Sequence, residues 1–231
     1  ALTQLGRLDE ARSILENGYK INSNDLAIIN NLANVYKNSF NFNEAEKFYK
    51  LSISKKKDYI NAYVNYGNLK RDLNKFEEAI KLYKNALNYT NQTPEIYYSL
   101  AMAYQSIGKF KDSDDYATKT IELDQKITKA DLLISRSKKY KKNDSHLTSM
   151  IKKIKEIELN KHQKIDLSFA IAKAHEDLGE INESFKFLIQ GNELKRSTLN
   201  FDINSEVKKF ENIKKIFANV NHSKFKKKKK E

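Results

Sequence analysis

The sequence of 231 residues contains no cysteine, no tryptophan, one proline and six glycines. Without cysteine the chain can form no disulfide, no thiolate metal site and no cysteine nucleophile. Its four histidines are scattered, and His146, His162 and His222 are isolated and lack the spacing of metal ligands. No apolar run approaches the roughly 20 residues that a membrane span needs. These absences predict a soluble protein that holds no metal and crosses no membrane.

Apolar residues are also scarce. They make up 39% of the chain, and the mean hydropathy is −0.74. Globular domains usually contain about 45–50% apolar residues. We therefore expect a thin core instead of several packed layers.

The formal net charge of +13 comes almost entirely from two short segments. Residues 128–164 contribute +7 and residues 224–231 contribute +5, so the rest of the chain is nearly neutral. Clustered lysines could bind nucleic acid or an anionic membrane weakly, with an affinity that falls with salt. Aromatic stacking residues are sparse beside them, so we prefer to interpret both segments as solvated charge runs.

A repeat of 34 residues runs through the first half of the chain. The segments LGRLDEA, FNFNEAE, NKFEEAI and GKFKDSD align so that Ala11, Ala45, Ala79 and Ser113 share one position. Within each unit the apolar residues recur three and four apart, first along one segment and then along a second. Each unit is therefore predicted to be a helical hairpin, whose small residue lies where the two helices approach most closely. The predicted fold class is all-α.

This pattern resembles the tetratricopeptide repeat (TPR). The best copy runs from Ala62 to Leu87, and its residues on the motif positions are Tyr63, Tyr66, Gly67, Phe76, Ala79, Tyr83 and Ala86. The chain departs from the family where tyrosine replaces the frequent tryptophan and where the closing proline is absent. The resemblance implies a right-handed α-solenoid of TPR hairpins with a concave surface that binds polypeptide.

The repeat divides the chain into eight parts. Residues 1–25 are predicted to be a partial repeat, and 26–59, 60–93 and 94–127 complete repeats. Residues 128–164 form a degenerate basic hairpin, and 165–198 a further TPR-like repeat. Residues 199–223 contain an amphipathic helix, and 224–231 are a Lys-rich tail.

The glycines and the proline fit this scheme. Gly67 is expected at a close contact between helices, and Gly108 and Gly179 at turns. Pro94 follows Thr93, a pattern typical of a helix start with a capping threonine. No glycine is left over for a loop that cradles phosphate.

We predict no catalytic site in this chain. His175, Glu176 and Asp177 form a polar cluster, but we expect it at the end of a first helix, facing solvent or the next turn. We therefore assign no catalytic residue, no cofactor and no metal to the chain.

The candidate binding site is the inner wall formed by the first helices. Asparagine is a poor helix former, yet it recurs there at 34 residues, pairing Asn31 with Asn65 and Asn34 with Asn68. Carboxamides could hold the backbone of an extended peptide whatever its side chains. A compositional bias towards asparagine is the alternative. The candidate partner-binding residues are Asn30, Asn31, Asn34, Asn65, Asn68, Arg71, Tyr98, Met102 and Gln105.

The C-terminal part resembles the region that precedes the catalytic domain in bacterial TPR-containing sulfotransferases. The resemblance covers roughly residues 128–223 and rests on the run AKAHEDLGEINESFKFLIQGNELKR, which ends in Gly191, Asn192, Leu194, Lys195 and Arg196. It implies a catalytic domain after this chain, which would bind the cofactor 3′-phosphoadenylyl sulfate. The alternatives are a stand-alone adaptor for a protein complex and the TPR region of a protein O-glycosyltransferase.

The chain begins with Ala1 instead of methionine, and its first repeat lacks a first helix. We therefore expect a partial sequence. A cytoplasmic location is expected, since no signal peptide is found in this sequence.

Overall fold

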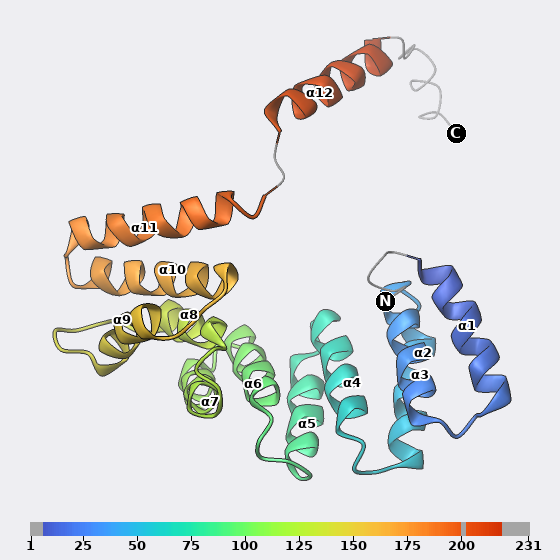
Figure 1. Ribbon diagram of the computed structural model, residues 1–231. Helices are drawn as coiled ribbons and strands as arrows, with labels where there is room; N and C mark the ends of the chain where they lie inside the picture. Colours follow the sequence, from blue (N-terminus) through green and yellow to red (C-terminus); the bar gives the residue numbers. More distant parts are fainter. Residues whose placement is uncertain (1–6, 200–201, 219–231) are drawn as a thin grey trace, which may run out of the picture.

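Figure 1 shows the computed structural model, which describes residues 7–199 and 202–218. These residues form twelve α-helices and no strand, which confirms the predicted all-α class. The Lys-rich tail, His222 and the first six residues of the partial repeat lie outside the described residues. The helices are α1 (Leu8–Ile21), α2 (Leu26–Asn38), α3 (Phe42–Lys55), α4 (Ile60–Asp72), α5 (Phe76–Leu87), α6 (Pro94–Ser106), α7 (Phe110–Leu123), α8 (Thr128–Ser137), α9 (Ser145–Glu156), α10 (Lys161–Asp177), α11 (Ile181–Arg196) and α12 (Ile203–Ala218).

Successive helices form hairpins that stack into a curved solenoid (Figure 1). The pairs α2–α3, α4–α5, α6–α7 and α10–α11 pack along their lengths. Each second helix also packs on the first helix of the next hairpin, in the pairs α3–α4, α5–α6 and α7–α8. In the first three repeats the first helices additionally contact one another, through α2–α4, α4–α6 and α6–α8. The first helices therefore lie on the inside of the curve and form its inner wall.

The aligned small residues lie where the sequence predicts them. Ala45, Ala79 and Ser113 are completely buried, and Ala11 and Ser184 are almost so. Gly67 makes the tightest approach: a Cβ atom there would lie 2.5 Å from Cε1 of Tyr83. At this contact a larger side chain would require the Tyr83 ring to move.

The turns between the helices of a repeat use the left-handed backbone region. Gly108 and Gly179 adopt φ angles of 73° and 74°, and the equivalent residues Phe40 and Asn74 adopt 59° and 58°. Pro94 lies in the first turn of α6, as predicted. The predicted cap is wrong: the Thr93 side chain makes no capping hydrogen bond.

Residues 128–164 depart from the repeat. α8 packs mainly on α7 and α10, and α9 packs on α10. The position 34 residues after Ser113 holds Leu147, and Met150 is completely buried one turn further on. Leu147 and Met150 of α9 form a separate core cluster with apolar side chains of α10.

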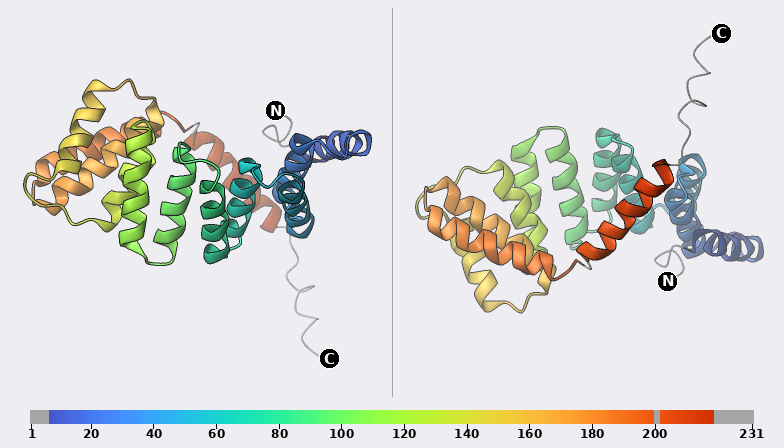
Figure 2. Two further views of the ribbon diagram at one scale, coloured as in Figure 1. Left: turned by 90° about the horizontal axis from the view of Figure 1, so that it is seen from below. Right: turned by 90° about the horizontal axis from the view of Figure 1, so that it is seen from above.

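The last helix stands apart. α12 packs closely on no other helix within residues 7–199, and Figure 1 shows it apart from the stacked hairpins; in the views of Figure 2, from below and above, it overlaps them. None of its described side chains is buried.

Candidate functional site: the inner wall of the solenoid

Two tyrosine–asparagine pairs connect the second helices to the inner wall. The completely buried Tyr49 donates its hydroxyl hydrogen to Oδ1 of Asn34 over 2.6 Å, and Tyr83 donates likewise to Asn68 over 2.8 Å. Because the tyrosine occupies the carbonyl oxygen, each carboxamide keeps its NH₂ group as a free donor within the described residues. Asn34 and Asn68 thus each bond to a tyrosine, and the two tyrosines are also 34 residues apart.

The other asparagines pair differently from the prediction. Nδ2 of Asn65 donates to Oδ1 of Asn30 over 3.3 Å, and Asn30 is 5% exposed. Asn31, which occupies the position equivalent to Asn65 in the preceding repeat, is exposed. The bonded pair is 35 residues apart, so it does not join equivalent positions of the 34-residue repeat.

The third repeat does not continue the tyrosine–asparagine pattern. At the corresponding positions it has Met102 and Ala117, which pack together in an apolar cluster. Nε2 of Gln105 donates to the main-chain oxygen of Leu133 in α8 over 3.4 Å. Arg71 is half-buried, with its guanidinium 3.6 Å from the carboxylate of Asp72. Met102 and Gln105 therefore contribute to packing in this structure.

An open pocket of about 630 Å³ lies where α6, α8 and α10 begin. Tyr98 is the only residue of the predicted set in its lining. The Thr128 hydroxyl donates to Asp166 over 3.0 Å, and Gln163 donates to the main-chain oxygen of Lys126 over 2.8 Å. The lining consists of Glu95, Tyr98, Lys126, Ile127, Thr128, Lys129, Asn160, His162, Gln163 and Asp166.

Burial shapes the electrostatics of this pocket. It raises the pKa of Tyr98, and the carboxylate of Asp166 raises it further, against the opposing effect of Arg136 and Arg71. Burial also raises the pKa of Asp166 above its usual range, against the hydrogen bond from Thr128. The pocket combines the aromatic ring of Tyr98 with acidic, basic and uncharged polar side chains.

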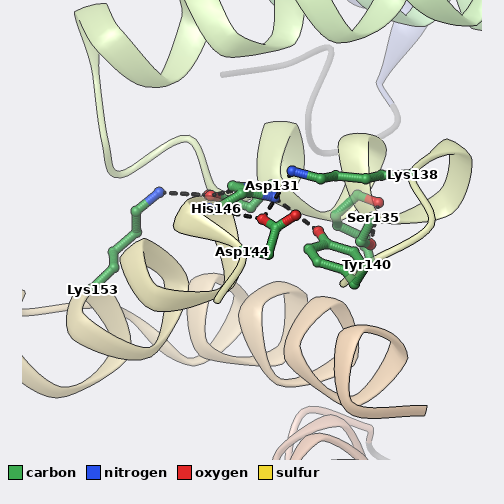
Figure 3. Close-up of polar contacts among 8 residues, drawn as sticks. Asp131, Ser135, Lys138, Tyr140, Asp144, His146 and Lys153 are labelled. Carbon is green, nitrogen blue, oxygen red and sulfur yellow. Dashed lines mark hydrogen bonds and ion pairs between the residues drawn. The ribbon is translucent and has the colours of Figure 1, made fainter. Parts of the chain in front are cut away.

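Sequence reasoning missed a buried network in residues 128–164 (Figure 3). Nζ of Lys153 lies 2.6 Å from Oδ2 of Asp131, and Nε2 of His146 lies 3.2 Å from Oδ1 of the same carboxylate. Nδ1 of His146 is 2.8 Å from the hydroxyl of Tyr140, and Asp144 caps the start of α9. The prediction that His146 is isolated is therefore wrong. The spacing of these residues carries no signal, because helix packing alone brings them together.

The polar cluster at the end of α10 is also less exposed than predicted. His175 is buried, lies 2.6 Å from the carboxylate of Glu180 and stacks on Phe187. The Asp177 carboxylate accepts hydrogen bonds from Lys139, Lys173 and the backbone N–H of Tyr140. Only Glu176 faces solvent. These contacts join α10 to its neighbours.

The described residues contain no group of three or more histidine, aspartate or glutamate side chains placed to hold a metal ion. A search of the same residues for a helix long and apolar enough to cross a bilayer finds none.

Comparisons with known proteins identify the repeats. A family model described as "TPR repeat" matches residues 67–108, and two described as "Tetratricopeptide repeat" match residues 26–57 and 94–127. Anaphase-promoting complex subunit CDC16 of Saccharomyces cerevisiae is 25% identical over 229 residues, which cover 94% of this chain and 24% of CDC16. Protein O-mannosyl-transferase TMTC3 of Mus musculus is 33% identical over 86 residues, or 37% of this chain and 9% of TMTC3. The chain thus spans a quarter or less of these relatives.

Solved structures with the same fold share little sequence. The C-terminal part of a TPR repeat-containing protein from Cytophaga hutchinsonii superimposes with a TM-score of 0.62 at 17% identity, over 82% of this chain and 79% of that one. PilF of Pseudomonas aeruginosa gives 0.60 at 16% identity, over 84% and 86%. YrrB, titled a TPR protein with an unusual peptide-binding site, gives 0.58 at 16% identity, over 79% and 92%. The chain therefore contains tetratricopeptide repeats and folds as an all-α TPR solenoid.

Proposed function

We propose that the inner wall binds an extended polypeptide, with the amides of Asn34 and Asn68 donating to its main-chain carbonyl groups. The observation that carries this proposal is the pair of tyrosine hydroxyls that hold both carboxamide oxygens. Each fixed amide presents donors only, and main-chain carbonyl groups recur along any peptide. Such binding would depend little on the side chains of the partner.

The remaining candidates have supporting parts in this proposal. Asn31 and the Asn30–Asn65 pair extend the polar surface along the wall, and Arg71 continues it towards Tyr98. The pocket at Tyr98 would take a polar side chain of the same polypeptide. Met102 and Gln105 would shape the wall without binding the partner directly.

Asparagine-to-aspartate substitution tests the proposal with little change of shape. Asn34→Asp and Asn68→Asp keep an acceptor for each tyrosine but remove both amide donors. On an array of unrelated peptides, we expect the double variant to bind at least about tenfold more weakly, because two hydrogen bonds of about 1 kcal/mol each are lost. Asn43→Asp, exposed on α3, adds one negative charge away from the wall and serves as the control for a single substitution.

Two results would oppose the proposal. If the folded wild-type chain captures no peptide, the proposal that the inner wall binds peptide is wrong. If wild type and double variant bind equally, Asn34 and Asn68 do not contact the peptide. A further test replaces one amide bond of a captured peptide by an ester, whose carbonyl group is a weaker hydrogen-bond acceptor. We expect weaker binding than that of the unmodified peptide when the replaced carbonyl group is one that Asn34 or Asn68 contacts.

A second proposal is an adaptor role within a protein complex. It is supported by the match to CDC16 over 94% of this chain, since that relative is a subunit of the anaphase-promoting complex. Here the partner would be a folded subunit. Co-purification of one stoichiometric partner that the Asn34→Asp, Asn68→Asp variant still binds would favour this proposal over peptide capture.

The sequence resemblance also supports the proposal that the repeats recruit acceptors for a sulfotransferase domain encoded downstream. That domain, and not this chain, would bind 3′-phosphoadenylyl sulfate. The match to TMTC3 supports the competing proposal of a protein O-glycosyltransferase. Sequencing the reading frame beyond the codon for Glu231 decides between them, since a phosphate-binding loop is expected only for the sulfotransferase. The proposed cytoplasmic location is tested by cell fractionation.

A further inference from the structure

The outer face of α11 is an uncovered apolar surface. One face of the helix packs on α10, where Gly191 lies against Phe169. On the other side Phe185 is 62% exposed and Leu188 is 36% exposed. Ile181 and Ile189 extend the same surface, which we call the α11 face. A group of neighbouring exposed apolar side chains indicates a surface to which another element or a partner binds.

The repeat shows what covers this face elsewhere. Leu188 follows the aligned small residue Ser184 by four positions, and the equivalent residues Tyr49, Tyr83 and Ala117 are completely buried. They pack between the first helix of their own repeat and the first helix of the next, as Tyr83 does between Gly67 of α4 and Leu100 of α6. Tyr49 stacks on Tyr66 of α4 with ring centroids 5.8 Å apart. The α11 face therefore has the position of a surface that receives a first helix.

The chain itself supplies a helix of the right kind. α12 follows α11 after six residues, 197–202, the same number that connect α5 to α6. Its apolar side chains recur with helical spacing, and each is about half exposed or more: Ile203, Val207, Phe210, Ile213 and Phe217. The spacing of Ile203, Val207 and Phe210 repeats that of Ala62, Tyr66 and Leu69 in α4.

We propose that α12 packs onto the α11 face of the same chain, as the first helix of a further repeat. The structure holds α12 apart (Figure 1), and the apolar side chains of both surfaces are exposed. A six-residue connection keeps α12 at a high effective concentration near α11, which favours this contact over one with a second copy. The match of Val207 to Tyr66 places Val207 against Leu188. This inference does not depend on polypeptide binding by the inner wall.

The absence of cysteine makes a direct test simple. Leu188→Cys combined with Val207→Cys is treated with a short bismaleimide that bridges the roughly 8–10 Å between packed helices. The control combines Leu188→Cys with Lys208→Cys, whose side chain points about 100° away from that of Val207 around α12. We expect an intrachain link at least about tenfold faster in the first pair, because its two thiols face each other.

Links between two chains in the first pair would overturn the proposal and identify a second copy as the occupant. Equal linking rates in both pairs would show that α12 does not pack on α11. Hydrogen exchange provides an independent reading without cysteines. Val207→Asp should speed exchange of the α12 amides at least about tenfold, since an unpacked 16-residue helix is only marginally stable. Lys208→Asp should leave their exchange close to wild type, and equal effects of both substitutions would also overturn the proposal.

Discussion

Nζ of Lys153 lies 2.6 Å and 2.9 Å from the two carboxylate oxygens of Asp131, and both side chains are completely enclosed. The pair joins α9 to α8, although neither helix packs mainly on the other. Residues 128–164, the most basic part of the described chain, thus contain one lysine that is structural. A solvated charge run describes their exposed lysines only.

Removing one partner of this pair should be far more harmful than removing both. Lys153→Met leaves the Asp131 carboxylate buried with only His146 beside it, so we expect the free energy of unfolding to fall by about 3–5 kcal/mol. Asp131→Leu combined with Lys153→Met should recover most of this loss. Urea denaturation followed by circular dichroism measures both, with the exposed Lys152→Met as control. A single variant as stable as wild type would contradict the structural role of the pair.

The stability of the solenoid should depend on pH through Glu46. Burial by itself would raise the pKa of this carboxyl, but hydrogen bonds from Lys50, Tyr66 and Lys70 lower it from 4.5 to about 2. A lowered folded-state pKa means stability that is present above pH 4.5 and is lost as the pH falls towards about 2. Glu46→Gln should flatten the decline of the unfolding free energy in this window.

Asp177, whose pKa is also lowered to about 2, keeps some of the decline in the Glu46→Gln variant. Denaturant titrations above and below the window compare the two proteins, with Glu77→Gln at an exposed site as control. Identical pH dependence in wild type and Glu46→Gln would sink the prediction.

The contact between Gly67 and Tyr83 predicts that a single added methyl group lowers the stability of the fold. In Gly67→Ala the new Cβ atom would meet the ring of Tyr83, which is completely buried and has no room to turn. We expect a loss of about 1–3 kcal/mol in thermal or urea unfolding. Asn61→Ala, exposed on the same helix, is the control. An unchanged midpoint would mean that α4 and α5 can separate without cost.

The turn before α3 offers a stabilising substitution. Phe40 has a φ angle of 59°, and a bulky side chain is strained in this region. Phe40→Asn should raise the free energy of unfolding by about 1 kcal/mol, because asparagine tolerates the left-handed backbone better. The reverse change, Asn74→Phe in the equivalent turn, should cost a similar amount. Melting temperatures that do not move in opposite directions would refute this account.

The sequence by itself determined the repeat, the hairpins and the helix count per unit. Apolar spacing and a small residue every 34 positions suffice, since each repeat makes mostly local contacts that the pattern states directly. The positions of Ala45, Ala79 and Gly67 followed from this pattern. So did the location of the asparagines on the first helices, although their partners did not.

Only the tertiary structure decided which polar groups meet. The Tyr83–Asn68 bond, the Asn65–Asn30 contact and the enclosure of Lys153 by Asp131 depend on the distance and shift between helices. A periodic pattern places a residue on a helix face, but it does not determine how two helices are positioned along each other or how far apart they lie. The packing of side chains between the helices determines both, and therefore which hydrogen-bond donors the inner wall presents.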